Sequence, residues 1–401
     1  MSFAKQYLII FCYTNTSKKN VLADAFPSIC SKMEYTFHTD FKSILSKLDE
    51  IDPITYGKTR NYVNGQITYL SPYISRGVIS TNQVFKHLLQ KGYSVAQMES
   101  LIQQLCWRDY FQRVAQVKSI SNELKHPQNP ISNHEIPEAI LTGTTGIKAI
   151  DNAIHLLYET GYMHNHCRLY TASLVCNSAQ SHWLNPAKWM YFHLLDGDWA
   201  SNACSWQWVA GTNSNKKYLA NQSNINTYTN SNQSNTFLDK TYEELQVVTI
   251  PSELTQTRTV LLKTSLPKVG PISIETSLPT FVYNYYNLDP TWHFEENGNR
   301  ILLLEPSFFK SYPISERCLD FMLQLSNNIP NLQVFVGSFN ELTTHIHTST
   351  IYFKEHPFNS HYVGIEEPRD WISPEITGYF PSFFAYWKKV KKSTRLHSSI
   401  Q

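Results

Sequence analysis

Three side chains that could contact a ligand recur at helical spacing near the middle of the chain. Asp198, Asn202 and Trp206 stand four residues apart, so a helix would place them on one face. A helix face that packs into a core is normally apolar, and a buried polar group without a partner costs about 1–3 kcal/mol. The stripe therefore favours a polar ligand over simple core packing. Asp196 stands just before it, across Gly197.

A second set of polar and aromatic residues has similar spacing. Trp107 and Arg108 follow Gln104 by three and four residues, and Arg168 follows Asn165 by three. Each group would therefore share one helix face. An indole, a guanidinium and an amide together predict a buried binding platform, and the polar edge of an amphipathic helix explains them equally well.

Ser71 and Pro72 together predict the start of a helix. Serine is a preferred N-cap, and proline is favoured at the first helical position. The hydroxyls of Thr68 and Ser71 would then lie beside backbone N–H groups that favour an anion. Ordinary helix capping explains the same pair of residues.

Hydrophobic periodicity predicts a mainly helical region between about Met33 and Val209, with helices at Gln97–Val117, Ile147–Tyr158 and Cys167–Ser178. The polar, asparagine-rich stretch 211–235 predicts a surface loop, and the prolines of 249–279 predict a linker.

The periodicity changes after this linker. Arg300–Glu305, Leu332–Gly337 and Thr350–Lys354 read as buried strands, and Ile314–Asn327 reads as a helix. Strands that alternate with helices predict a small, parallel, Rossmann-like α/β domain.

Composition narrows the class of protein. The 401 residues are 42% hydrophobic and 16% charged, with a formal net charge of +2, which indicates a globular protein without a global basic field for nucleic acid. Seven scattered cysteines without a CxxC pair predict reduced thiols and no metal site. The apolar run Tyr7–Tyr13 is too short to span a bilayer. We expect an intracellular, cytoplasmic or nuclear monomer, with organelle targeting left open.

Six stretches of the sequence carry a resemblance to a known family. In family order, they are Tyr56–Asn61, Thr68–Ser80, Leu105–Phe111, Gly161–Leu169, Leu194–Gly211 and Ile250–Leu254. Across Phe37–Leu254 the chain resembles the FAD-binding domain of photolyases and cryptochromes. The resemblance implies an N-terminal extension at 1–32, which should be dispensable, and an all-helical FAD-binding domain at 33–254. A linker at 255–297 and a small α/β domain at 298–401 would follow.

The resemblance also implies roles for single residues. The expected FAD-binding set is Tyr56, Thr68, Ser71, Arg108, Asn165, Arg168, Asp196, Asp198 and Asn202. Of these, the two hydroxyl residues and the tyrosine would hold the phosphates, the arginines would contact the flavin, and Asn202 would face flavin N5. Asparagine at that position is the photolyase choice.

A cavity for a flipped pyrimidine dimer in DNA is implied at Gln104, Trp107, Asn165 and Trp208. Stacking of an extruded base on an aromatic ring is worth about 1–3 kcal/mol. The pair His164-Asn165 with Leu169 favours a cyclobutane dimer, because (6-4) photolyases carry histidines there.

Electron transfer is implied along Trp206 and Trp183, which match the first two tryptophans of the family's chain. The expected catalytic set is therefore Trp206, Trp183, Asn202 and Gln104. The third tryptophan is missing from Asn129–Ile140, and Trp189 or a nearby tyrosine could replace it.

Two further departures bear on function. Gln104 stands where the family has a cavity glutamate, and Ile67 replaces a threonine of the phosphate motif. The leading hypothesis is a deoxyribodipyrimidine photolyase-like lyase that repairs cyclobutane dimers with reduced FAD and blue light. A cryptochrome-like photoreceptor without repair activity is the alternative, and a flavin-free helical scaffold that binds nucleic acid is the third.

Overall fold

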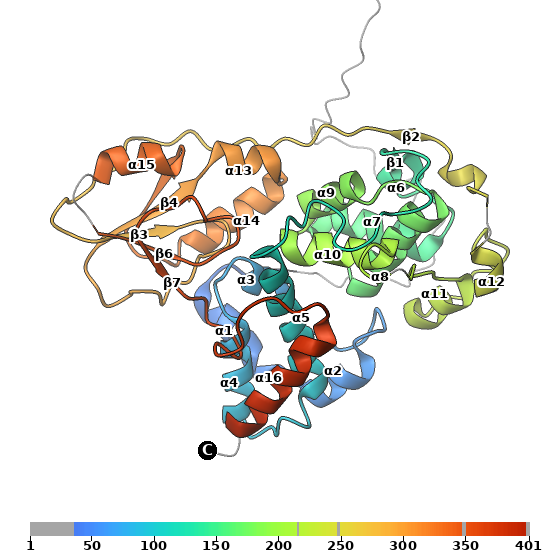
Figure 1. The fold of residues 1–401 in the computed structure, drawn as a ribbon, viewed down its shortest axis with the longest axis horizontal. Helices are drawn as coiled ribbons and strands as arrows, with labels where there is room; N and C mark the ends of the chain where they lie inside the picture. The colour runs from blue at the N-terminus through green and yellow to red at the C-terminus, as the bar shows by residue number, and fades with distance from the viewer. Residues whose placement is uncertain (1–35, 215, 247–248, 347–349, 398–401) are drawn as a thin grey trace, which may run out of the picture. The chain divides into compact units, whose positions relative to one another are not determined.

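The computed structural model describes residues 36–214, 216–246, 249–346 and 350–397 (Figure 1). The expected extension 1–32 and its run Tyr7–Tyr13 lie outside the described residues. Residues from Phe37 onward form one compact unit.

The first part of this unit is helical, as predicted. Its helices are α1 Phe41–Asp49, α2 Pro53–Thr59, α3 Ser71–Ser75, α4 Thr81–Gln90, α5 Glu99–Ala115, α6 Glu138–Thr142, α7 Lys148–Thr160, α8 Asn165–Ser173, α9 Leu184–His193, α10 Trp199–Ala210, α11 Gln222–Thr229 and α12 Tyr242–Leu245. A π-helical turn, Leu174–Ser178, continues α8, and a 3-10 turn is formed by Ser252–Leu254. A short antiparallel pair joins β1 Ile136–Pro137 to β2 Thr257–Arg258.

Several helices in this part begin or end with ordinary capping chemistry. The Asp198 carboxylate accepts from Ser201 N at 2.7 Å and so caps α10. Ser80 and Gln83 form a capping box at the start of α4, in which each side chain satisfies the other residue's backbone N–H. Gly211, with φ 83°, ends α10 in a left-handed conformation that glycine adopts without steric cost.

The second part contains a five-stranded parallel sheet. Its strands are β3 Thr280–Tyr283, β4 Asn299–Leu304, β5 Leu332–Val336, β6 Ile351–Lys354 and β7 Ile365–Glu367, in the order β5-β4-β3-β6-β7. The accompanying helices are α13 Pro306–Ser311, α14 Glu316–Ser326 and α15 Phe339–Ile346, and the chain ends in α16 Phe383–His397. The prediction of a mainly helical protein with a parallel α/β unit is confirmed at this level.

The two faces of the sheet pack against different groups of residues. Along β4, Ile301 and Leu303 join a cluster that includes Phe339 and Leu342 of α15. Leu302 and Leu304 join the large core that also contains the helical part. This alternation follows from the two-residue period of a strand, and it makes the sheet a wall of the main core.

The structure differs from the expected domain boundaries at both ends of the α/β region. The residues of β3 fall within 255–297, which was expected to be a linker. Instead, the four residues TFVY form a fully buried strand at the centre of the sheet. α16 lies in the expected α/β domain 298–401 but packs on α5, where the ring of Phe383 contacts those of Trp107 and Tyr110.

Candidate functional site

The helical part encloses a cavity of about 460 Å³. Residues of α2, α5, α8 and α10 and of the segment before α3 line it. Clefts that hold small molecules or cofactors are typically about 300–1,000 Å³ in volume. The residues predicted for cofactor or substrate that line this cavity are Tyr56, Thr68, Ser71, Gln104, Trp107, Arg108, Asn165, Arg168, Asp196, Asp198, Asn202, Trp206 and Trp208. Trp183 is the predicted site residue that lies elsewhere.

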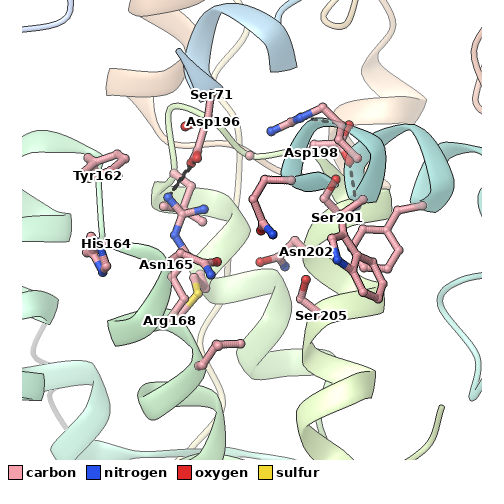
Figure 2. Close-up of a pocket in the computed structure, with 18 of the residues that line it drawn as sticks. Ser71, Tyr162, His164, Asn165, Arg168, Asp196, Asp198, Ser201, Asn202 and Ser205 are labelled. Carbon is pink, nitrogen blue, oxygen red and sulfur yellow. Dashed lines mark hydrogen bonds and ion pairs between the residues drawn. The ribbon is translucent and has the colours of Figure 1, made fainter. Parts of the chain in front are cut away.

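A buried ion pair forms one side of the cavity. Arg168 Nη2 lies 3.0 and 2.9 Å from the two carboxylate oxygens of Asp196, and Figure 2 shows Ser71 beside this pair. Burial alone would raise the pKa of Asp196, but the charge and hydrogen bond of Arg168 hold that pKa below its ordinary value. The Arg168 Nε atom also donates to the Met163 carbonyl at 2.7 Å. The guanidinium is therefore held in one orientation by two independent contacts.

Asp198 organises the opposite side. Besides capping α10, its carboxylate accepts from the amide of Gln112 and lies 3.8 Å from Arg108 Nη1. Arg108 donates to Ser75 Oγ at 2.8 Å, and Ser75 donates to the Asp196 carbonyl at 2.7 Å. Asp198 is thus linked to the backbone of Asp196 by one ion pair and two hydrogen bonds.

The start of α3 differs from the prediction. Leu70 takes the N-cap position without a side-chain hydrogen bond, and Ser71 is the first helical residue. Thr68 Oγ1 accepts from Leu70 N at 3.4 Å. α3 has only five residues, so its dipole offers an anion little. Ser71 therefore does not cap α3, and it lines the cavity beside Asp196.

Tyr69 has the left-handed φ of 51° and also lines the cavity. Such a conformation costs a non-glycine residue about 1–3 kcal/mol and is concentrated at functional sites. Its ring packs 5.5 Å from that of Tyr162, so neighbouring aromatic residues hold this strained segment in place.

The polar stripe of α10 points into the cavity, as Figure 2 shows for Asp198, Ser201, Asn202 and Ser205. Asn202 Nδ2 donates to the Ala187 carbonyl at 2.8 Å. The buried Ser201 hydroxyl has no hydrogen-bond partner among the described residues. A buried hydroxyl without a partner is costly, so this one is a position where a polar ligand atom fits.

The aromatic residues expected to meet a flipped dimer lie in different surroundings. Trp208 is 39% exposed and packs 5.4 Å from the ring of Tyr218. The Trp107 ring is stacked on Phe383 of α16, with centroids 3.6 Å apart and planes at 10°. One face of Trp107 is therefore already covered by the chain's own last helix.

Trp206 and Trp183 are both buried, but only Trp206 lines the cavity. Within the described residues, no direct ring contact joins these two tryptophans. Trp189, the suggested replacement for the third member of the chain, donates from Nε1 to the Tyr158 hydroxyl at 3.1 Å. This hydrogen-bonded pair is a second aromatic group in the same part of the protein.

His164 precedes α8 and lines the cavity. Its Nδ1 accepts from His166 N at 3.2 Å. Burial, followed by the nearby charges of His166 and Arg168, lowers the pKa of His164 to about 4. The imidazole is therefore neutral at physiological pH.

Several residues of the site were missed by sequence reasoning. Gln112 stands four residues after Arg108 on the same face of α5, so its spacing could have revealed it. Ser75 carried no such signal, because its role comes from contacts with the distant residues Arg108 and Asp196. Ser201 carried none either, because its unpartnered hydroxyl is visible only in the folded cavity.

Five cysteines among the described residues, Cys106, Cys167, Cys176, Cys204 and Cys318, are free and buried. In the same part of the chain, no group of three or more His, Cys, Asp or Glu residues is placed to hold a metal ion. None of the described helices is both long and apolar enough to cross a bilayer.

The helical part therefore holds a cavity that is lined by both arginines and carboxylates. Residues 101–260 match the FAD binding domain of DNA photolyase. A deoxyribodipyrimidine photo-lyase of Streptomyces griseus is 32% identical over 146 residues, which are 36% of this chain and 32% of that relative. The chloroplastic/mitochondrial cryptochrome DASH of Ostreococcus tauri is 32% identical over 171 residues, or 39% of this chain and 31% of that protein.

Among solved structures, a Synechocystis cryptochrome matches over 48% of this chain and 44% of its own, with 23% identity and a TM-score of 0.41. The chain spans about a third of the length of the curated relatives that it matches. Over residues 101–260 the chain is similar to the FAD-binding domain of the photolyase/cryptochrome family, and the predicted resemblance is confirmed.

Proposed function

We propose that the chain binds FAD in the 460 Å³ cavity and is a blue-light-driven DNA photolyase for cyclobutane pyrimidine dimers. The observation that carries the proposal is the gathering of the nine predicted FAD-binding residues around one cavity, six of them within the stretch that matches the FAD binding domain of DNA photolyase.

The donor set of the cavity fits FAD. Tyr56, Thr68 and Ser71 line it and offer hydroxyl groups to the phosphates. Arg108 and Arg168 line it as well and offer N–H donors to the flavin. The unpartnered Ser201 hydroxyl offers a further polar contact. Asp196 and Asp198 supply acceptors for ribose hydroxyls or for N–H groups of the flavin. The cavity thus combines the two kinds of polar group that a dinucleotide requires.

When bound and reduced, FAD would supply the excited electron that splits a dimer, since the cofactor carries the difficult chemistry and the protein positions it. Arg168 and Asp196 would orient the cofactor through a contact pair that is already formed. Asn202, held by Ala187, would present its remaining polar atoms to flavin N5. Trp206, at the cavity wall, and Trp183, deeper in the core, would carry electrons during photoreduction.

Gln104, Trp107, Asn165 and Trp208 would receive the extruded dimer. An enzyme that acts on bases takes them out of the stack and binds them in such a pocket. The amides of Gln104 and Asn165 can donate to the pyrimidine carbonyls, and the exposed Trp208 offers a stacking surface.

A second function, a photoreceptor without repair activity, is favoured by one observation. Phe383 occupies a face of Trp107, which leaves less aromatic surface for a base. Gln104 also favours a photoreceptor, because a neutral amide stands where the family has a carboxylate.

FAD binding is tested by Arg168→Ala and Asp196→Ala, each purified and compared with wild type for flavin absorbance per chain. We expect both variants to be largely apoprotein, because each leaves a buried charge unpaired. Arg258→Ala is the matched control, since Arg258 is an exposed arginine whose carboxylate partner, Glu138, lies 4.0 Å away. Full flavin occupancy in both cavity variants contradicts the assignment.

Repair is tested with an oligonucleotide that contains one cyclobutane dimer, under blue light and with reduced flavin. Light-dependent loss of the dimer supports the photolyase, whereas bound flavin without any repair favours the photoreceptor. A colourless protein that takes up no flavin contradicts both.

A further inference from the structure

A second, smaller cavity of about 80 Å³ lies at the carboxyl ends of β3 and β6. Asn284 and Asn287 line it after β3, and Lys354, the last residue of β6, and His356 line it on the other side. In the strand order β5-β4-β3-β6-β7 the direction of winding reverses between β3 and β6. Open parallel sheets bind ligands at this position, outside the carboxyl ends of the strands.

Three donor atoms of this cavity have no acceptor among the described residues. They are His356 Nε2, Asn287 Nδ2 and Arg369 Nη1. The first two side chains are more than nine-tenths buried, at 8% and 7% exposed. His356 Nδ1 accepts from Phe358 N at 3.3 Å, so the hydrogen of the neutral ring is on Nε2. A buried donor without a partner costs about 1–3 kcal/mol, and three such donors belong to residues that line this cavity.

The carboxylates around the same cavity are satisfied. Asp370 accepts from Ser80 and from Asn82, the latter at 2.7 Å. The other three, Asp109, Asp289 and Glu355, accept from Thr81, Thr291 and Trp371, respectively. What the cavity lacks is therefore an acceptor. A metal cation would meet three N–H donors, whereas an oxygen-rich ligand would satisfy all three.

The charges of the cavity permit an anion. Arg108, Lys354 and Arg369 line it and offset three of its four carboxylates, and each carboxylate accepts from its own donor. Burial raises the pKa of Asp109 to about 6, which weakens its charge near that pH. Of the three positive groups, Arg369 is the one with a buried, unpartnered donor atom, Nη1, for a ligand.

We propose that this cavity binds a free tetrahedral oxyanion of the size of phosphate, held by His356, Asn287 and Arg369. One water needs about 10–15 Å³, so 80 Å³ admits five non-hydrogen atoms but no isoalloxazine ring. The small volume of the cavity and its three unpartnered donors together favour a compact ligand that accepts hydrogen bonds. The site is independent of the proposed function, although Arg108 lines both cavities.

The test is calorimetric titration of the full chain with inorganic phosphate, at constant ionic strength in chloride and after saturation with FAD. Asn287→Asp replaces a donor by an acceptor of the same shape and adds a negative charge. Arg369→Gln removes a cation from the same wall. We expect saturable binding to wild type at one ion per chain and at least tenfold weaker binding to each variant.

Asn340→Asp makes the same charge change at an exposed position of α15 and should bind phosphate as wild type does. Asn287 lines only the small cavity, so binding of phosphate to the large one is not affected by its substitution. Anomalous diffraction from crystals soaked in selenate should place the anion between β3 and β6.

Absence of saturable binding of both phosphate and sulfate to wild type overturns the proposal. Equal affinity in wild type and in a folded Asn287→Asp variant, as judged by its melting temperature, overturns it as well. A protein that binds phosphate but fails to bind FAD would contradict the proposed function and leave the oxyanion site supported.

Discussion

Gln104 lies in the cavity wall one helical turn from Trp107 and Arg108. Glutamine preserves the shape of the family's glutamate but donates only neutral hydrogen bonds. A charge-assisted hydrogen bond contributes about 1.5–3 kcal/mol and a neutral one about 0.5–1.5 kcal/mol. The difference, if expressed in the transition state, is close to a factor of ten in rate, because about 1.4 kcal/mol corresponds to tenfold.

We therefore expect weak repair by wild type and an increase of up to about tenfold in Gln104→Glu, with flavin binding unchanged. The measurement is repair yield per absorbed photon on a dimer-containing oligonucleotide. Gln103→Glu is the matched control, because Gln103 is the neighbouring residue of α5 and does not line the cavity. No repair by wild type or by Gln104→Glu would remove the photolyase hypothesis.

Burial of His164 makes the stability of the folded protein depend on pH. Its pKa falls from 6.5 in the unfolded chain to about 4 in the folded one, mainly because of burial. Between these values the unfolded state binds more protons, so stability decreases as the pH falls from 6.5 towards 4. The shift corresponds to roughly 3 kcal/mol, at about 1.4 kcal/mol per pKa unit.

His164→Asn keeps an N-cap acceptor and removes the titration. We expect the free energy of unfolding, measured by denaturant titration between pH 4 and pH 7.5, to fall less steeply on acidification than in wild type. The slope should not vanish, because burial lowers the pKa values of His166 and His193 in the same direction. The exposed His126 supplies a control, and a wild-type slope in His164→Asn would contradict the expectation.

At the scale of elements, α16 covers one face of the Trp107 ring and so limits the aromatic surface on which a base can stack. Phe383 is 3% exposed and covers the Trp107 ring. Phe383→Ala should lower stability by about 3–5 kcal/mol, as is usual for a buried phenylalanine. It should also strengthen binding of a dimer-containing oligonucleotide, because an aromatic face becomes free for stacking.

Phe380→Ala is matched to this variant. Phe380 is buried as well and packs 5.4 Å from the ring of Tyr386, without a ring contact to Trp107 among the described residues. Binding measured by fluorescence anisotropy should increase in Phe383→Ala alone. Equal affinities in both variants and in wild type would mean that α16 does not limit access to the cavity.

Helices and strands could be predicted where their sequence has strong hydrophobic periodicity. They were harder to predict where contacts with distant segments determine the local structure. α5, β4 and β5 fall close to their predicted ranges because each carries a regular apolar pattern. β3 lacks such a signal, since its four residues follow a proline-containing stretch and are buried on both faces. An amphipathic helix such as α16 indicates that one face is buried but not which element covers it.

The site was predictable to a similar extent. The spacing of Asp198, Asn202 and Trp206 predicts that α10 forms one wall of the cavity. The family motifs predict residues of the other walls. The link from Arg108 through Ser75 to Asp196 joins residues 33 and 121 positions apart. Periodicity contains no information about such a link. The same holds for His356 and Asn287, whose missing acceptors are visible only once the sheet is folded.

At the scale of the whole molecule, the helical part and the sheet depend on each other. Arg76 is fully buried and lies 3.5 Å from the ring centroid of Tyr285 in the loop after β3. Gly77, with φ 66°, meets the same loop so closely that a Cβ atom would lie 2.4 Å from the Tyr286 carbonyl oxygen. α16 in turn covers Trp107 and Tyr110.

A chain that ends at Leu254 should therefore aggregate or lose flavin, because it exposes the aromatic surface of α5. Soluble yield and flavin absorbance provide the measurement. The control is the full chain carrying a protease site at Leu261, which is 92% exposed, cut after purification. Both pieces should then remain associated. A stable, flavin-loaded chain ending at Leu254 would show that the helical part folds alone.

The return of α16 to α5 has a mechanical consequence. Both ends of the described chain, α1 and α16, belong to the helical part, and the sheet is inserted between them. A force applied to these ends acts on the packing of α1 against α4 and of α16 against α5 before it reaches the strands. Stretched in an optical trap, the protein should first release these terminal helices in small steps. The sheet should open only afterwards, in a separate and larger one.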